Sequence, residues 1–121
     1  MTIRSYRDLH VWRKAIDLVE ASYRATDTFP PAERYGLVAQ MRRASVSIAS
    51  NIAEGHARSS GDFHRHLTIA AGSLVELETQ FVISLRLGFA SRDKVRTASG
   101  LAREVGRMLT GLRRRLRSRK P

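Results

Sequence analysis

Polar side chains that could do acid–base chemistry recur at helical spacing in two segments of the sequence. They follow one another at intervals of three or four residues: Gln40, Arg43, Ser47, Asn51, Glu54 and Arg58, then Ser73, Glu76 and Gln80. Residues at these spacings share a helix face, so the two sets can face each other beside the apolar stripes of their helices. Carboxylates near arginines can act as a general acid and base, but a fixed salt-bridge network between helices or subunits is far commoner. We therefore interpret six of them as a structural polar network that makes packing specific: Arg43, Ser47, Asn51, Glu54, Glu76 and Gln80.

A second candidate for chemistry is an arginine followed six positions later by a histidine, Arg58 and His64. Arginine binds phosphate and histidine moves protons, and the spacing resembles the ribonuclease motif of HEPN four-helix domains. With nineteen arginines and four histidines, roughly two pairs separated by four to six intervening residues arise by chance, and the chain has two, the other being Arg4 with His10. We favour a loop arginine beside a solvated histidine.

Metal and cofactor sites are not expected from the sequence. It has no cysteine, and none of its histidines are four residues apart, the spacing that would put two ligands on one helix face. No phosphate loop, dinucleotide fingerprint, zinc-protease motif or nucleophile elbow occurs. The sequence therefore predicts no metal, no cofactor, no catalytic residue and no enzyme activity.

The strongest signal is positive charge near the C-terminus. The formal net charge is +11, and residues 92–121 hold eleven basic and two acidic residues, whereas residues 1–91 are nearly neutral. At 100° per residue, five arginines fall within about 40° of one line along a helix. They are Arg92, Arg96, Arg103, Arg107 and Arg114. This asymmetry predicts a polyanionic partner.

Nucleic acid is the polyanion that we favour. The opposite face of the same helix is apolar and needed for a core, which argues against a membrane-surface role. No tryptophan or tyrosine is interleaved with the arginines, so contacts would be mostly to phosphates, with weak sequence specificity and strong salt dependence. The alternative is a solvated face in an arginine-rich protein. The predicted nucleic-acid-binding residues are Arg92, Arg96, Arg103, Arg107, Arg113, Arg114, Arg115 and Arg117.

These residues need helices to position them. A chain of 121 residues, 42% of them hydrophobic, fits a single domain, and its 3.6-residue periodicity predicts an all-α fold. We expect helices at about 5–27, 33–57, 60–88 and 91–117, with Ser5 capping the first and Pro30 and Pro31 following it. Short connections favour an antiparallel up-down-up-down four-helix bundle. Residues 113–121 are predicted to be a basic, frayed tail.

Each predicted helix carries an apolar stripe. In the first helix the stripe consists of Leu9, Trp12, Ile16, Val19 and Tyr23. The third helix is apolar beyond its stripe, because further apolar groups lie on its other sides: Ile69, Val75, Val82 and Ile83. A helix that is apolar most of the way round is usually buried on several sides, so we expect a homo-oligomer. No apolar leader or membrane-spanning segment is evident, which suggests a cytoplasmic protein.

Three blocks of sequence carry a family resemblance: DLHVWRKA at 8–15, QMRRASVSIASNIAEG at 40–55 and GSLVELETQ at 72–80. They resemble the bacterial four-helix bundle proteins encoded in 23S rRNA intervening sequences, which implies assembly as a homopentamer. The chain is also similar to the accessory variability protein of diversity-generating retroelements, a basic pentamer that engages a reverse transcriptase and nucleic acid. The resemblance offers no established catalytic residue.

We therefore interpret the protein as a non-enzymatic oligomer that binds RNA or DNA through its basic C-terminal helix. The first alternative is a protein-interaction scaffold that serves as an accessory factor for a reverse transcriptase. The second is a ribonuclease that uses Arg58 and His64.

Overall fold

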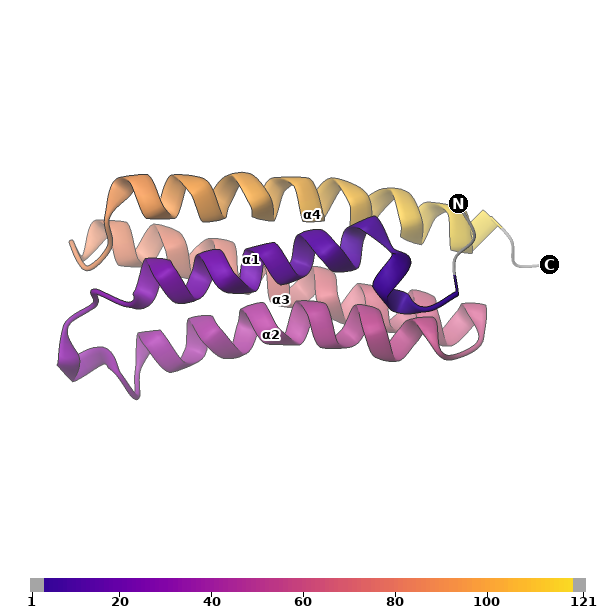
Figure 1. The fold of residues 1–121 in the computed structure, drawn as a ribbon, viewed down its shortest axis with the longest axis horizontal. Coiled ribbons are helices and arrows are strands. Elements are labelled where there is room, and N and C mark those ends of the chain that lie inside the picture. The colour runs from indigo at the N-terminus through magenta and orange to yellow at the C-terminus, as the bar shows by residue number, and fades with distance from the viewer. Residues whose placement is uncertain (1–3, 119–121) are drawn as a thin grey trace.

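The computed structural model describes residues 4–118 and consists of four long helices with no strand in that range. The elements are η1 (Tyr6–Asp8), α1 (His10–Thr26), η2 (Pro31–Glu33), α2 (Leu37–His56), α3 (Ser60–Arg86) and α4 (Arg92–Ser118). The helices lie side by side, and their connections fall at alternating ends (Figure 1). Each of the four packs against two others, α1 with α2 and α4, and α3 with α2 and α4. The predicted all-α class with four helices is confirmed.

The N-terminal segment differs from the prediction because Ser5 caps a short 3-10 turn instead of α1. Its hydroxyl accepts from the Arg7 N–H at 3.1 Å, and the Asp8 carboxylate accepts from the N–H groups of Arg4 and Ser5 at 2.8 and 3.2 Å. These backbone donors lower the pKa of Asp8. Leu9 is extended, with φ −77° and ψ 127°, so α1 begins only at His10. The predicted cap is present, but it belongs to a separate turn.

The predicted apolar stripe of α1 packs at the edge of the core and not at its centre. The residues that are buried lie one position away from the predicted stripe and are mostly small: Val11, Ala15, Leu18, Ala21, Ser22 and Ala25. Trp12, Ile16 and Val19 are only half-buried, and Tyr23 is exposed beneath the Arg42 guanidinium, 4.4 Å from its ring centroid. Small residues let α1 approach its neighbours closely, whereas the bulky side chains cover the flanks of the contact.

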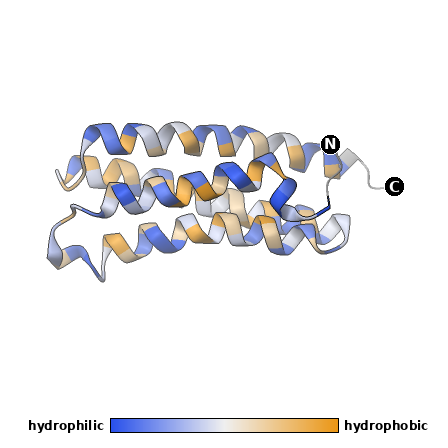
Figure 2. Ribbon diagram, in the orientation of Figure 1, coloured by the Kyte–Doolittle hydropathy of each residue, from blue (hydrophilic) through white to orange (hydrophobic). Residues whose placement is uncertain are grey.

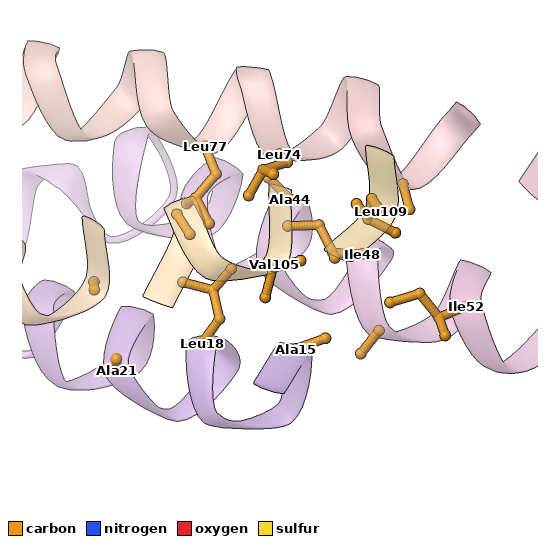
Figure 3. Close-up of a cluster of buried hydrophobic side chains, with 14 of the residues drawn as sticks. Ala15, Leu18, Ala21, Ala44, Ile48, Ile52, Leu74, Leu77, Val105 and Leu109 are labelled. Atoms are coloured by element: carbon orange, nitrogen blue, oxygen red, sulfur yellow. The ribbon is translucent and has the colours of Figure 1, made fainter. Parts of the chain in front are cut away.

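The other stripes are buried largely as expected. Close packing joins the centre of all four helices (Figure 3) through Leu18, Ile48, Leu77, Val105 and Leu109, which are at most 1% exposed. Hydrophobic residues recur along every helix (Figure 2). On α3, however, the apolar side chains beyond the stripe remain exposed in the single chain: Ile69, Val75, Val82 and Ile83.

The helix ends refine two predicted boundaries. Helix α2 begins at Leu37, later than expected, because the two prolines start a 3-10 turn and Glu33 then accepts from the Leu37 N–H at 3.3 Å. Helix α3 ends at Arg86, where Gly88 takes a φ of +75°. The Gly88 N–H then donates to the Leu85 carbonyl at 3.1 Å, a termination that favours glycine.

The predicted frayed tail is helical as far as the structure describes it. Helix α4 continues to Ser118, and Leu116 is 5% exposed. The reason is that Leu109, Leu112 and Leu116 continue the apolar stripe, so packing against the bundle outweighs the repulsion of neighbouring arginines. Residues 119–121 of the predicted tail lie outside the described residues.

Candidate nucleic-acid interface

Helix α4 presents a row of exposed arginines on the side opposite its buried stripe. The stripe includes Val95, Ala98, Ala102, Val105 and Leu109, all at most 3% exposed. The arginines follow one another at intervals of four and seven residues, so they share one face of the helix. Because the opposite face is buried in the bundle, the arginine face is turned to solvent. We call this set the α4 arginine row: Arg92, Arg96, Arg103, Arg107 and Arg114.

The two carboxylates of α4 neutralise little of this row. Asp93 lies 3.3 Å from Arg96 in a pair that is exposed on both sides, and Glu104 lies 3.2 Å from Lys14 of α1. Exposed pairs of this kind contribute little and are screened by salt. The other members of the row, Arg92 among them, form no ion pair with any residue between 4 and 118. Their guanidinium groups are available to an anion in solution.

The remaining predicted contact residues do not all lie in the row. Arg117 is exposed near the end of α4. Arg113 is half-buried and faces α3, where it lines a hollow together with Leu74. Arg115 faces α1 instead and lines a hollow of about 410 Å³ beside His10. The structure therefore divides the eight predicted arginines among three sides of α4.

The predicted polar network is present in part, between α2 and α3. The hydroxyls of Ser47 and Ser73 lie 2.9 Å apart. The Asn51 side-chain amide donates to the Ser47 carbonyl at 2.9 Å and lies 3.2 Å from its hydroxyl. The Asn51 oxygen is 2.9 Å from Nδ1 of His66, which is 6% exposed. We call these four residues the polar seam: Ser47, Asn51, His66 and Ser73.

Other members of the predicted network take no part in these bonds. Arg43 and Glu76 line a small hollow of about 210 Å³ at the seam, but they form no ion pair or hydrogen bond within the described part of the chain. A carboxylate oxygen of Glu54 is 3.9 Å from Nδ1 of His66, and the two form an ion pair only when the imidazole is protonated. Gln80 is 5% exposed, and its Oε1 has no partner within residues 4–118.

The prediction missed His66, although the sequence holds a signal for it. Positions 66, 73 and 80 are seven residues apart, so His66 shares a helix face with Ser73 and Gln80. The same contact requires Gly55, because a Cβ there would lie 2.6 Å from the Cβ of His66. Helices α2 and α3 therefore meet closely where His66 reaches Asn51.

The residues of the ribonuclease alternative lie near the connection between α2 and α3. Arg58 is exposed just after α2, and its N–H donates to the Gly55 carbonyl at 3.0 Å. His64 is half-buried in the early part of α3, and its carbonyl accepts from the Thr68 hydroxyl at 3.0 Å. His66, one position beyond Arg65 on the same helix, lies 2.9 Å from the Asn51 oxygen of α2.

Metal-binding and membrane-spanning features are absent from residues 4–118. No group of three or more histidines, aspartates and glutamates is placed to hold a metal ion in that range. None of the described helices has both the length and the apolar character needed to span a membrane.

Fold and site together define a small all-α protein with one strongly basic helix. The chain belongs to the 23S rRNA-intervening sequence protein family, whose model matches residues 7–111. The resemblance carried by the three sequence blocks is thus confirmed at the level of the family.

A solved structure from Bacteroides thetaiotaomicron is similar in fold. It is described as a protein with unknown function from the S23 ribosomal protein family. The TM-score is 0.78 at 20% sequence identity, over 86% of this chain and 95% of that chain. At this identity the similarity shows the fold alone. No curated protein matches the chain.

Proposed function

We propose that this protein is a non-enzymatic, homo-oligomeric nucleic-acid-binding protein that contacts phosphates through the α4 arginine row. The observation that carries the proposal is a helix with nine basic and two acidic residues whose arginines stand exposed on one side. The two carboxylates are already paired with Arg96 and Lys14. Guanidinium groups in such a row suit phosphate oxygens, which they bind with paired N–H donors.

The mechanism is electrostatic. Binding of each phosphate releases condensed counterions, so affinity falls as salt rises, by a slope of about 0.9 per phosphate for duplex DNA and about 0.7 for single strands. The row itself holds no aromatic side chain, so its contacts give orientation and affinity with little base selectivity.

The test replaces Arg103, Arg107 and Arg114 with glutamine and measures binding to RNA and DNA from about 50 to 200 mM salt. We expect weaker binding and a log–log salt slope that is flatter by about two to three, one unit or slightly less per lost phosphate contact. The matched control replaces three exposed arginines elsewhere, Arg24, Arg34 and Arg58, with glutamine. The proposal fails if the affinity of the wild-type protein does not change with salt concentration. It also fails if the α4 variant and the control variant lose the same amount of affinity.

Assembly is part of the same proposal. We infer an up-down-up-down bundle, supported by the alternating connections (Figure 1), and a homo-oligomer, supported by the exposed apolar residues of α3. The pentamer implied by the resemblance would repeat the arginine row around a ring. A relation to the accessory variability protein would make a reverse transcriptase the partner. In that case the triple glutamine variant would lose the enzyme partner and keep its nucleic-acid affinity.

The same preparation tests the absence of enzyme activity. We expect RNA to stay intact after prolonged incubation with the protein. Metal-independent cleavage that disappears in His64→Ala would replace the proposal with a ribonuclease.

A further inference from the structure

Two separate hollows lie between α3 and α4 beside the arginine row. The larger hollow has a volume of about 560 Å³, within the usual range of ligand sites. The second hollow, of about 480 Å³, lies further along the same two helices, between Leu85 and Arg96. We call the two together the α3–α4 groove. Arg96 of the second hollow and Arg107 of the first are about 16 Å apart along α4 at 1.5 Å per residue.

One wall of the larger hollow is apolar. Ala71, Leu74 and Val75 contribute it from α3, and Leu109 contributes from α4. Val75 is 62% exposed, so solvent reaches this wall in the single chain. Gly106 lies in the same hollow, where a Cβ would come within 3.2 Å of Leu74. Leu74 and Leu109 are only 5% and 1% exposed, so Val75 and the half-buried Ala71 supply most of the aliphatic surface that an occupant could contact.

The rim of the hollow is basic. Arg107, Arg113 and Arg114 line it from α4. The Nε of Arg113 is buried and has no hydrogen-bond partner within residues 4–118. Arg86, Arg92 and Arg96 line the second hollow. An occupant of the groove must therefore be a polyanion that also has apolar surface.

A single carboxylate stands inside this basic rim. Glu78 lines the hollow, is half-buried and forms no ion pair or hydrogen bond in the described part of the chain. It repels phosphates and acidic side chains alike, but it can accept an N–H from the exocyclic amino group of a base, a donor that the carboxylates of an acidic helix do not offer. The charges of the groove thus favour a nucleotide over an acidic protein helix.

We propose that the α3–α4 groove binds a single-stranded segment of nucleic acid, with an unpaired base in the hollow beside Leu74 and Val75. The proposal rests on the nucleic-acid-binding function proposed above and adds its substrate class. Phosphates of the strand lie against Arg107 and Arg114, the base packs on the aliphatic wall, and Glu78 accepts from the amino group of the base. A duplex can use the arginines but not the wall, because its base faces are stacked on each other.

The test compares a single-stranded oligonucleotide with a duplex of the same length, using the full chain and its oligomer. Phosphate contact alone favours the duplex, which carries twice the charge. We expect Val75→Asn to weaken single-strand binding about five- to tenfold, because the base then loses apolar surface to pack on, and to leave duplex binding unchanged. The matched control is Val46→Asn, an exposed valine of α2 outside the groove, which should change neither.

A second comparison tests the role of Glu78. The wild-type protein should prefer oligocytidine to oligouridine of equal length, because only cytosine offers an amino group to the carboxylate. Glu78→Leu, which leaves no acceptor, should abolish that preference without lowering affinity for oligouridine. Thermal melting of each variant checks that the bundle remains folded.

The outcomes separate the two proposals. If both nucleic acids bind with the expected salt dependence and Val75→Asn affects them equally or not at all, the groove proposal is overturned and the arginine row stands. If neither nucleic acid binds, both proposals are overturned. If an acidic amphipathic peptide binds instead and Val75→Asn weakens its binding, the groove is a protein-docking surface and the single-strand proposal is wrong.

Discussion

At the scale of single residues, the close contact between α2 and α3 depends on a glycine. Gly55 is buried where α2 meets α3, and a Cβ there would lie 2.6 Å from the Cβ of His66 and 2.9 Å from Cδ1 of Phe63. The Cβ of His66 is held by its own backbone, so it cannot move unless the helices separate. Gly72, on α3, faces solvent, and a Cβ there would meet no neighbouring side chain or helix within 4 Å.

The two glycines therefore make opposite predictions. We expect Gly55→Ala to lower the free energy of unfolding by about 1–3 kcal/mol, because overpacking forces the two helices apart. We expect Gly72→Ala to raise it by about 0.5–1 kcal/mol, because alanine has the higher helix propensity and meets nothing. Urea denaturation followed by circular dichroism measures both. Equal stabilisation by the two substitutions would contradict the close approach of α2 and α3.

At the scale of elements, the polar seam joins α2 to α3 through buried groups that need one another. Asn51 is its central member, because its amide reaches Ser47 and its oxygen reaches the ring of His66. The neighbouring residue Ser50 points away from the seam and is exposed. The two positions offer a test of the seam on a single turn of helix.

We predict that Asn51→Ala lowers the free energy of unfolding by about 1–3 kcal/mol. The cause is that the Nδ1 of buried His66 then loses its partner at 2.9 Å. Ser50→Ala should stay within about 0.5 kcal/mol of the wild type, as exposed substitutions do. Chemical denaturation of both variants at one pH measures the free energy of unfolding. If Asn51→Ala lowers it no more than Ser50→Ala does, the polar seam does not stabilise the bundle.

The sequence predicts these elements better than it predicts which side of them is buried. Periodicity alone places the α4 arginine row, since one helix carries both the arginines and the stripe opposite them. On α1 the same reasoning fails because it weighs Trp12 and Ile16 by hydrophobicity, whereas close packing selects Ala15 and Ser22 for their small size.

Features built from two helices are harder to predict. The α3–α4 groove combines Val75 of one helix with Arg113 of another, and no pattern within either segment pairs them. The period that relates His66 to Ser73 and Gln80 places it on the right face of α3, but it does not name Asn51, fifteen residues away on α2, as its partner. Within residues 113–118 the prediction of a frayed tail is wrong because it weighs charge alone, although Leu116 continues the apolar period that keeps the segment helical.

At the scale of the whole molecule, the large apolar residues exposed on α3 do not share one face: Ile69, Val75, Val82, Ile83 and Leu85. On a helical wheel Val75 and Val82 point about 20° apart, Ile69 and Ile83 about 40° apart, and Ile69 and Val75 about 120° apart. Val75 forms part of the α3–α4 groove. Ile69 and Ile83 lie outside both hollows of that groove and are 42% and 41% exposed. Val82 is 53% exposed and also lies outside both hollows, so Ile69, Val82 and Ile83 are the apolar groups of α3 left for a second copy of the chain to cover.

This division predicts that assembly and groove binding can be uncoupled. Replacing Ile69 and Ile83 together with glutamate should break a homo-oligomer into monomers, because desolvating two carboxylates in an apolar contact is costly. Light scattering coupled to size-exclusion chromatography gives the mass directly. Val46→Glu, on an exposed part of α2, should leave the mass unchanged. The monomer should still bind single strands, with the lower avidity of one site instead of several. An undisturbed oligomer in the double variant would place the subunit contact elsewhere and leave the apolar surface of α3 unexplained by self-association.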